Sequence, residues 1–339
     1  MTQQYDKLPP EAFKLVKVNS THAEQIARPS LNFWQDAWLR LRKNKAAVIS
    51  MIVLIFFVII ALVGPHLNSY GYNDQNVSKA NLPPKISWLA PLGIADGYAE
   101  VAGKKVDVYA QKNVKENYWF GTDSLGRDLF TRVWKGSQIS LLIAFVAALV
   151  DVIIGVAYGG ISGYYGGKVD DIMQRIIEIL AGIPNLIIVI LMLMVMEPGI
   201  TAIIIAIALT GWIGMSRIVR GQVLKFKNQE FVLASRTLGA SNSRIIFKHL
   251  LPNIMAIIVI NTMFTVPTAI FFEAFLSFIG LGLQAPNASL GTLINDGYKM
   301  LQFQPYMLGI PAAVLSILMI AFNLLGDGLR DALDPKMKD

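Results

Sequence analysis

Six apolar stretches constrain the fold of this chain more than any other feature of its sequence. They cover residues 46–63, 137–160, 176–196, 199–215, 254–272 and 306–326, and Asp151 and Glu178 are the only charged residues inside them. A helix that crosses a lipid bilayer needs about 20 mostly apolar residues. The pattern therefore predicts an all-α polytopic membrane protein with six transmembrane helices, the third and fourth joined by a tight turn at 197–199.

Composition agrees with a membrane protein and excludes several other classes. Charged residues make up 16% of the 339 positions, whereas soluble domains average about 25%. No cysteine is present, which excludes disulfides, Cys-based zinc sites and iron–sulfur clusters. The three histidines, His22, His66 and His249, share no metal-ligand spacing, so no metal site is predicted.

The distribution of basic residues predicts the orientation. The tail 1–45 holds eight Lys and Arg, and the loop 216–253 holds seven with a single acid, Glu230. Cytoplasmic loops carry such an excess. Both termini and the 216–253 loop are therefore expected in the cytoplasm, and the net charge of +7 is interpreted as an orientation signal rather than as nucleic-acid binding.

These boundaries divide the chain into five predicted regions. The tail 1–45 contains an amphipathic stripe of Leu31, Trp34, Trp38 and Leu41, which favours a helix in the membrane interface over a simple extension of the first span. The first span (46–66) precedes an extracytoplasmic loop (67–136) with a candidate hairpin over 101–108 that turns at Gly103-Lys104. The permease-like core (137–328) and a cytoplasmic C-terminal tail (329–339) follow.

The chain lacks a nucleotide-binding motif of its own. Its nearest candidate is the stretch 162–170, where Ser162 replaces the first glycine of a Walker A loop and Val169 replaces the Ser or Thr after the lysine. Gly163, Gly166 and Gly167 are better interpreted as a flexible cytoplasmic loop. The chain is therefore not expected to be an enzyme by itself.

The cytoplasmic segment 230–253, EFVLASRTLGASNSRIIFKHLLPN, is the most informative part of the sequence. Its first nine residues favour a helix, which Gly239 ends. Ser241 or Asn242 can cap a second helix, which Pro252 is expected to end. A helix–turn–helix of this size is large enough to dock another protein.

This segment resembles the coupling loop of ABC-transporter permeases. Ala234, Gly239, Leu251 and Pro252 match the general consensus, while Leu233, Ser235 and His249 depart from it. The peptide-permease variant fits more completely, at the following positions: Glu230, Phe231, Val232, Ala234, Arg236, Gly239, Ala240, Ser241, His249, Pro252 and Asn253.

Two further motifs, at 121–141 and 273–283, are similar to signatures of the same subfamily. The resemblance covers residues 33–335 and is strongest to the C-type permease subunit of the oligopeptide and dipeptide (Opp/Dpp) importers. It implies the type I ABC importer permease fold (MetI-like) in a bacterial or archaeal plasma membrane.

The resemblance also implies a function and partners. The chain would form half of a peptide pathway with a homologous second permease, two cytoplasmic ATPases would use ATP and Mg, and an extracytoplasmic binding protein would deliver substrate. No cofactor would be bound by this chain itself. The residues implied in ATPase coupling are Glu230, Ala234, Ser235, Arg236, Gly239, Ala240, Ser241, Arg244 and Pro252.

Polar residues inside the spans are candidates for lining the pathway. Asp151, Asn261 and Glu273 are the candidates, because an ionisable side chain in lipid is costly and usually faces protein or water. Structural pairing is the alternative for each, and Glu273 is expected near a wet external end. Asp123, Arg127 and Asp128 predict a local salt-bridged turn rather than a substrate contact.

Three other functions remain open at this point. The same architecture could import nickel or another small solute. A secondary transporter would need inverted repeats and buried ion ligands, and no repeat is evident. A membrane-anchored scaffold would not need the docking segment.

Overall fold

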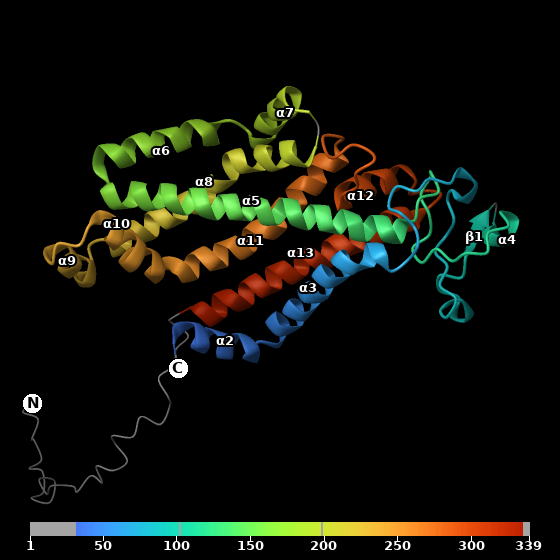
Figure 1. Ribbon diagram of the computed structural model, residues 1–339, viewed down its shortest axis with the longest axis horizontal. Helices are drawn as coiled ribbons and strands as arrows, with labels where there is room; N and C mark the ends of the chain where they lie inside the picture. Colours follow the sequence, from blue (N-terminus) through green and yellow to red (C-terminus); the bar gives the residue numbers. More distant parts are fainter. Residues whose placement is uncertain (1–31, 102, 198, 335–339) are drawn as a thin grey trace, which may run out of the picture.

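A computed structural model describes residues 32–101, 103–197 and 199–334, and in these ranges the chain consists mainly of long helices lying side by side (Figure 1). A small loop-rich subdomain occupies one end of the molecule, and the helix–turn segment around α9 and α10 occupies the other. The prediction of a mainly helical chain is confirmed.

Five helices of the described ranges are long and apolar enough to cross a membrane. They are α3 (Lys45–Val63), α5 (Leu129–Tyr165), α8 (Ile200–Phe226), α11 (Leu251–Phe278, with the helical turns from Asn242) and α13 (Pro305–Leu333). A sixth crossing requires α6 (Gly167–Gly182) and α7 (Asn185–Val195) to count as one span.

The prediction of one continuous third helix over 176–196 is wrong. The axes of α6 and α7 differ by 81°. Ile183 (ψ 125°) and Pro184 (ψ 126°) are extended between them. Proline lacks the N–H of a helical residue and disfavours the helical conformation of the residue before it, so the chain turns at Pro184.

The N-terminal helix α2 (Phe33–Lys43) is separate from α3. Asn44 is extended between the two helices, and its side chain accepts a hydrogen bond from the Ala47 N–H at 3.2 Å, which caps α3. Leu41 packs with Ala332 near the end of α13. The simple extension of the first span is therefore excluded, while Leu31 lies outside the described residues and the place of α2 in the interface stays a prediction.

The outward face of α2 is aromatic. Phe33, Trp34 and Trp38 are all more than two-fifths exposed, and Arg42 lies 4.8 Å from the centre of the Trp38 ring. The expected amphipathic character is thus present, with Leu41 rather than the tryptophans buried against protein.

Small residues bring α5 and α8 into close contact. Gly155, Gly159 and Gly163 recur every fourth residue of α5, and a Cβ added to Gly159 would lie 2.3 Å from the Ser216 carbonyl oxygen of α8. Spaced small residues allow membrane helices to approach in this way. The glycines at 163–167 therefore do not form a flexible loop, because α5 continues to Tyr165 and Gly166 (φ +65°) turns the chain directly into α6.

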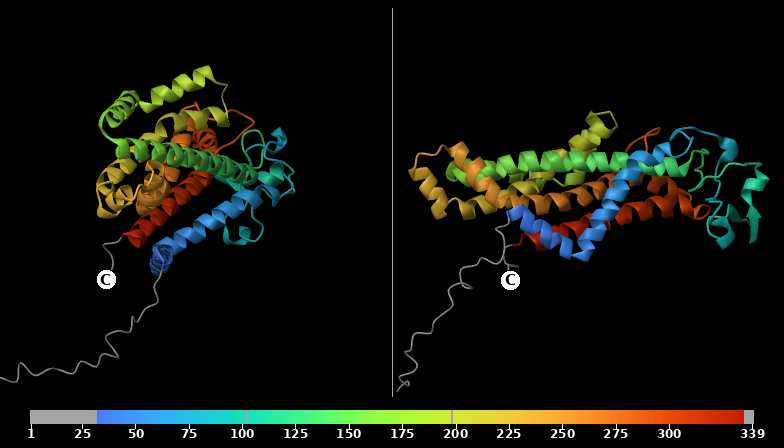
Figure 2. Two further views of the ribbon diagram at one scale, coloured as in Figure 1. Left: turned by 60° about the vertical axis from the view of Figure 1, so that its left-hand side comes forward. Right: turned by 60° about the horizontal axis from the view of Figure 1, so that its bottom comes forward.

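A partly buried ion pair holds the start of α6 against α8. The guanidinium of Arg220 donates from two nitrogens to the two oxygens of Asp170, at 2.6 Å each. Such a two-point geometry fixes orientation as well as distance. The turn after α5 is thereby fixed at the same end of the bundle as α9 and α10 (Figure 2).

Two large apolar clusters hold the long helices together. One lies among α3, α5, α12 (Leu290–Lys299) and α13, where Phe57, Phe130 and Trp134 meet edge to face. The other joins α5, α8 and α11 through fully buried isoleucines such as Ile143 and Ile270. The C-terminal helix α13 continues to Leu333, so the boundary placed at 328 falls inside a helix.

The extracytoplasmic candidate subdomain lies between α3 and α5. It contains short turns η2 (Gly64–His66), η3 (Val77–Lys79) and η4 (Ala90–Leu92), the hairpin β1 (Tyr98–Val101) and β2 (Lys104–Asp107), and α4 (Val108–Gln111). A hairpin is present as predicted, but its strands cover 98–107 rather than 101–108, and Lys104 belongs to β2 rather than to the turn, since it pairs with Val101.

The chain leaves this subdomain through a salt-bridged turn, as predicted. Arg127 Nε lies 2.6 Å from Asp123 Oδ2. Asp128 caps α5 by accepting from the Thr131 N–H at 2.8 Å. These two acids therefore fix the start of the longest helix of the described chain.

Candidate functional site

Two places in the molecule combine the predicted functional residues. The first is the segment 230–253, hereafter the coupling segment, which lies at the tip of the bundle opposite the β hairpin (Figure 1). The second is a pocket among α5, α8 and α11.

The coupling segment consists of α9 (Glu230–Thr237), α10 (Asn242–Arg244) and η5 (Ile245–Leu250). Gly239 has φ +79°, a left-handed conformation that glycine adopts without strain. Its N–H donates to the Arg236 carbonyl, and the Ala240 N–H donates to the Ser235 carbonyl. Ser241 then caps α10 by accepting from the Arg244 N–H at 3.3 Å. The predicted helix, glycine turn and capped second helix are confirmed.

The prediction that Pro252 ends the second helix is wrong. The π-helical turn η5 runs directly into α11, and Pro252 stands in the first turn of α11. Proline is tolerated there. In the π turn the Leu251 N–H reaches the Ile246 carbonyl, and the Asn253 side chain donates to the His249 carbonyl at 2.6 Å. The second half of the coupling segment is therefore one continuous helical rod with the fifth span.

Buried apolar residues attach the coupling segment to the spans. Val232, Ile245 and Leu250 are fully buried and pack with Val219 and Val223 of α8. Tyr164, in the last turn of α5, donates its hydroxyl to Asn242 at 2.8 Å. A force applied to α9 or α10 would thus be passed to α5, α8 and α11 together.

Most of the predicted coupling residues lie on the outer surface. Glu230, Ala234, Arg236, Gly239, Ser241, Arg244 and Pro252 are exposed, while Ser235 and Ala240 are half-buried. Arg236 lies 5.7 Å from the centre of the Tyr164 ring. Within the described part of the chain, neither Arg236 nor Arg244 forms an ion pair.

Three apolar residues of the coupling segment were not among the predicted functional residues. Leu238 is 88% exposed, Phe247 69% and Leu233 45%. Large apolar side chains displayed on a protein surface mark sites of interaction. The sequence alone does not single them out, because the segment also contains apolar residues that are buried, such as Val232 and Ile245. Which of them are exposed depends on which face of each helix is buried.

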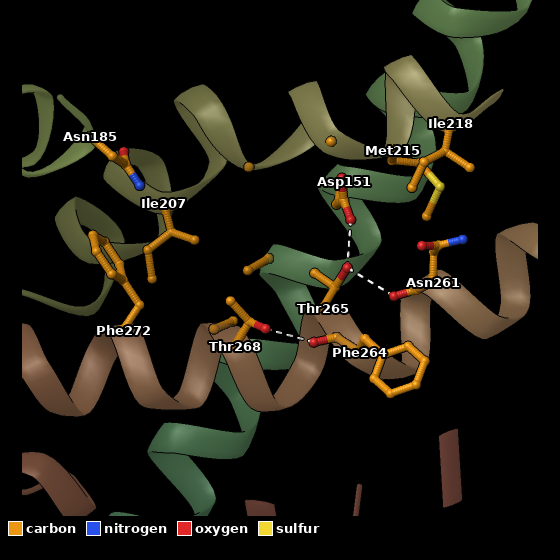
Figure 3. A pocket seen from close by; sticks show the side chains of 14 residues that line it. Asp151, Asn185, Ile207, Met215, Ile218, Asn261, Phe264, Thr265, Thr268 and Phe272 are labelled. Atoms are coloured by element: carbon orange, nitrogen blue, oxygen red, sulfur yellow. Dashed lines mark hydrogen bonds between the residues drawn. The ribbon is translucent and has the colours of Figure 1, made fainter. Parts of the chain in front are cut away.

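The pocket among the spans has a volume of about 310 Å³ and is lined mainly by apolar residues of α5, α8 and α11. Its polar residues are Asp151, Asn185, Asn261, Thr265 and Thr268 (Figure 3). Two of the three predicted pathway residues, Asp151 and Asn261, therefore line the same pocket.

Asp151 lies at the wall of this pocket and is 4% exposed. Its Oδ2 accepts a hydrogen bond from the Thr265 hydroxyl of α11 at 2.8 Å. Its Oδ1 has no hydrogen-bond partner in the described chain. The Asn261 side chain instead donates to the carbonyl of Ile257 in its own helix, at 2.8 Å.

Glu273 is placed elsewhere, and its expected wet position is wrong. The side chain is fully buried, because α12 folds back over this end of α11. Its two oxygens accept from the hydroxyls of Ser140 and Ser277 at 2.8 Å each. Glu273 therefore joins α5 to α11 and does not line the pocket that contains Asp151.

Family models match most of the chain. Residues 152–339, more than half of it, match the binding-protein-dependent transport system inner membrane component. Residues 32–84 match the N-terminal transmembrane domain of oligopeptide transport permease C.

Curated relatives match over nearly their full length. The dipeptide transport system permease protein DppC of Bacillus subtilis is 47% identical over 99% of this chain and 96% of that relative. The oligopeptide transport system permease protein OppC of the same organism is 45% identical over 98% of this chain and 99% of that relative. DppC of Lactococcus lactis is 50% identical over 94% and 95%.

Among solved structures, a chain from the inward-facing MetNI methionine ABC transporter matches at 22% identity. The match covers 61% of this chain and 96% of that one, with a TM-score of 0.49.

Proposed function

Because the chain belongs to the family of binding-protein-dependent transport system inner membrane components, we propose that it forms one half of the membrane pathway of an ATP-driven peptide importer. It is a permease component of an ABC importer of the bacterial inner membrane. The observation that carries the peptide assignment is the nearly full-length similarity to dipeptide and oligopeptide permeases.

The other half of the pathway would come from a homologous second permease. In this chain the pocket beside Asp151 is lined mainly by α5, α8 and α11. A second subunit that faced these helices would supply the opposite wall and complete a passage. With α6 and α7 counted as one broken span, the chain would cross the membrane six times, with both termini in the cytoplasm.

The coupling segment would bind a cytoplasmic ATPase. Leu238 and Phe247 would enter an apolar groove on that partner, and Arg236 and Arg244 would meet acids at its rim. Two such ATPases would bind ATP and Mg, while this chain binds no cofactor. Their closure would push the coupling segment, and the continuous rod from Asn242 to Phe278 would convert that push into a tilt of the spans.

The first experiment is a mild-detergent pull-down of the tagged chain from its native membranes. We expect co-purified ATPases whose hydrolysis rises when short peptides and the extracytoplasmic binding protein are added. A chain that elutes alone, without ATP hydrolysis in several detergents, contradicts the importer assignment.

A matched pair of variants tests the docking surface itself. Leu238→Glu should lose the co-purified ATPases, because a charge replaces the apolar residue offered to the partner. Leu92→Glu changes another highly exposed leucine (72%), in η4 at the other end of the molecule, and should retain them. Equal recovery from both variants would refute the role given to the coupling segment.

A further inference from the structure

We propose that the Asp151 carboxylate, with the acceptor atoms around it, is the point on this chain that binds the protonated amino terminus of a peptide during passage. The inference rests on the proposed importer function and adds the chemical group that the pathway recognises.

Asp151 is an acid without a basic partner. The salt bridges of the described residues include none to Asp151, although it is buried in the middle of α5. Burying an unpaired carboxylate is costly. An ionisable residue kept inside a membrane bundle without a pair indicates a functional site. The cost would be offset whenever a cationic group of a substrate reaches the pocket.

Beside Asp151 the hydrogen bonds leave acceptors rather than donors facing a ligand, whereas Asn185, on the α7 side of the same pocket, keeps its amide donors because its oxygen accepts from the Thr210 hydroxyl at 2.6 Å. The Thr265 hydroxyl donates to Asp151, and the Thr268 hydroxyl donates to the Phe264 carbonyl at 2.8 Å (Figure 3). Asn261 turns its amide nitrogen to its own helix, which leaves its oxygen free to accept. Asp151 Oδ1 accepts from no described group.

A primary ammonium is complementary to such a wall. It has three donors and no acceptor, so each N–H can meet one of these oxygens. Beside Asp151, a carboxylate or a phosphate would find acceptors opposing it. Every unmodified linear peptide has a primary ammonium at its amino terminus, unless that residue is proline, whose ammonium is secondary. A contact there would therefore bind peptides regardless of most of their side chains.

A merely structural role makes a different prediction. If Asp151 serves only to hold α5 against α11, the important feature is the hydrogen bond from Thr265 at 2.8 Å. Asparagine retains an oxygen that can accept this bond but loses the charge. Valine at 265 loses the bond but leaves the charge of Asp151 in place.

The experiment measures initial uptake of radiolabelled trialanine, whose single cation is its amino terminus, by cells that contain the complete transporter. The variants are Asp151→Asn, Thr265→Val and, as a control for loss of an acid, Glu178→Gln on the exposed face of α6. Asp151→Asn should lower uptake about tenfold, as expected for loss of a charge-assisted hydrogen bond. The other two variants should remain near wild type, with equal amounts of chain in the membrane.

A second measurement restores the charge chemically. The chain has no cysteine, so Asp151→Cys can be modified selectively, with the wild-type transporter treated in parallel. An anionic sulfonatoethyl methanethiosulfonate should raise trialanine uptake, whereas the neutral methyl reagent should not. Equal rates after the two reagents, or no modification at all, would overturn the proposal.

The failures can be told apart. Absence of ATP-dependent trialanine uptake by the wild type would refute the importer function and this inference with it. Normal wild-type uptake with no loss in Asp151→Asn, or with a larger loss in Thr265→Val, would overturn the ammonium site alone.

Discussion

At the level of single residues, the two acids buried among the spans use their oxygens differently. Glu273 accepts from a serine hydroxyl at each oxygen, whereas Asp151 has one oxygen bonded to Thr265 and one without a partner. A fully satisfied buried acid stabilises a helix contact, and an incompletely satisfied one is free to bind a ligand. The same residue class therefore has a structural role at one depth and a proposed binding role at another.

Gly239→Glu should abolish peptide uptake while the chain still inserts into the membrane. A Cβ at Gly239 would meet no atom of this chain within 4 Å, so the cost is that of a left-handed side chain, about 1–2 kcal/mol. The larger effect would arise at the proposed ATPase surface. The assay is uptake at matched membrane levels of the chain.

The control for backbone strain is Gly103→Glu, in the hairpin turn at the opposite end. Gly103 has φ +75° and equally open surroundings. The Gly103→Glu substitution should therefore lower the free energy of unfolding by a similar amount without loss of uptake. Wild-type uptake by the Gly239 variant would contradict the coupling assignment.

Asp128 should make the start of α5 less stable as the pH rises. Burial, which outweighs its hydrogen bonds to Thr131 and Asn68, raises the pKa of this carboxyl. The folded chain therefore keeps the proton to a higher pH than the unfolded chain, whose pKa is about 3.9. The stability gained from that proton is fully present below the unfolded pKa and is lost as the pH rises through the folded pKa.

Asp128→Asn removes this titration and keeps a side chain that can cap the helix. The measurement is thermal unfolding of the purified chain in detergent. The melting temperature of the variant minus that of the wild type should rise as the pH is raised from about 4, near the pKa of an unperturbed aspartate. A difference that falls with pH would show that the carboxylate, not the acid, is favoured by folding.

At the level of elements, the arrangement of the helices depends on the close packing of α5 against α8 and on the unbroken join between the coupling segment and α11. Hydropathy alone does not specify either feature. The glycines of α5 let α8 pack against its backbone, and the coupling segment is joined to α11 without a break. The Asp170–Arg220 pair adds α6 to the same assembly. Elements that are far apart in the sequence thus respond as a unit at the end where ATPases are proposed to bind.

Gly159→Ala should destabilise the chain, by about 1–3 kcal/mol as is typical of overpacking, because the new methyl group would lie 2.3 Å from the Ser216 carbonyl oxygen. Gly160→Ala is the matched control, since a Cβ there meets no atom within 4 Å outside its own helix. It should be neutral or stabilising, as alanine favours helix. Thermal unfolding in detergent would measure both, and an equal shift of the two variants would argue against close α5–α8 packing.

At the level of the whole molecule, the coupling segment and the hairpin subdomain lie at opposite ends of a long bundle (Figure 2). An importer needs this separation, because substrate would be delivered at one face of the membrane and ATP hydrolysed at the other. The span lengths and the basic residues of the coupling segment agree with that arrangement.

Single cysteines placed in the cysteine-free chain would test the orientation. Leu92→Cys in η4 should react with a membrane-impermeant maleimide in intact cells, whereas Leu238→Cys should react only after the membrane is opened. Both positions are more than two-thirds exposed in this chain, so access of the reagent is matched in cells that produce the chain without the ATPases, whose proposed groove would cover Leu238. The reverse labelling pattern would invert the proposed topology.

Features governed by local chemistry could be predicted from the sequence. Hydropathy located the helices, since a span of apolar residues satisfies its own backbone in lipid. Gly239, Ser241 and Asp123 act on residues a few positions away, so their turn and cap roles were predicted and are confirmed. Asp128 was predicted only as part of the salt-bridged turn, and it caps α5. The ATPase-coupling roles of 230–253 stay predictions.

Features that depend on contacts between distant segments were decided only by the tertiary structure. Pro184 bends a span by 81° while Pro252 continues a helix, because the outcome depends on the turns around each proline. Glu273 is covered by α12 and accepts a hydrogen bond from Ser140, whereas Asp151 is only partly satisfied, by Thr265. In both hydrogen bonds the two residues lie more than 100 positions apart in the sequence. The sequence by itself determined where the long apolar segments lie and which protein family the chain belongs to. Three-dimensional packing determined which polar atoms were left without partners, since that depends on every neighbour at once.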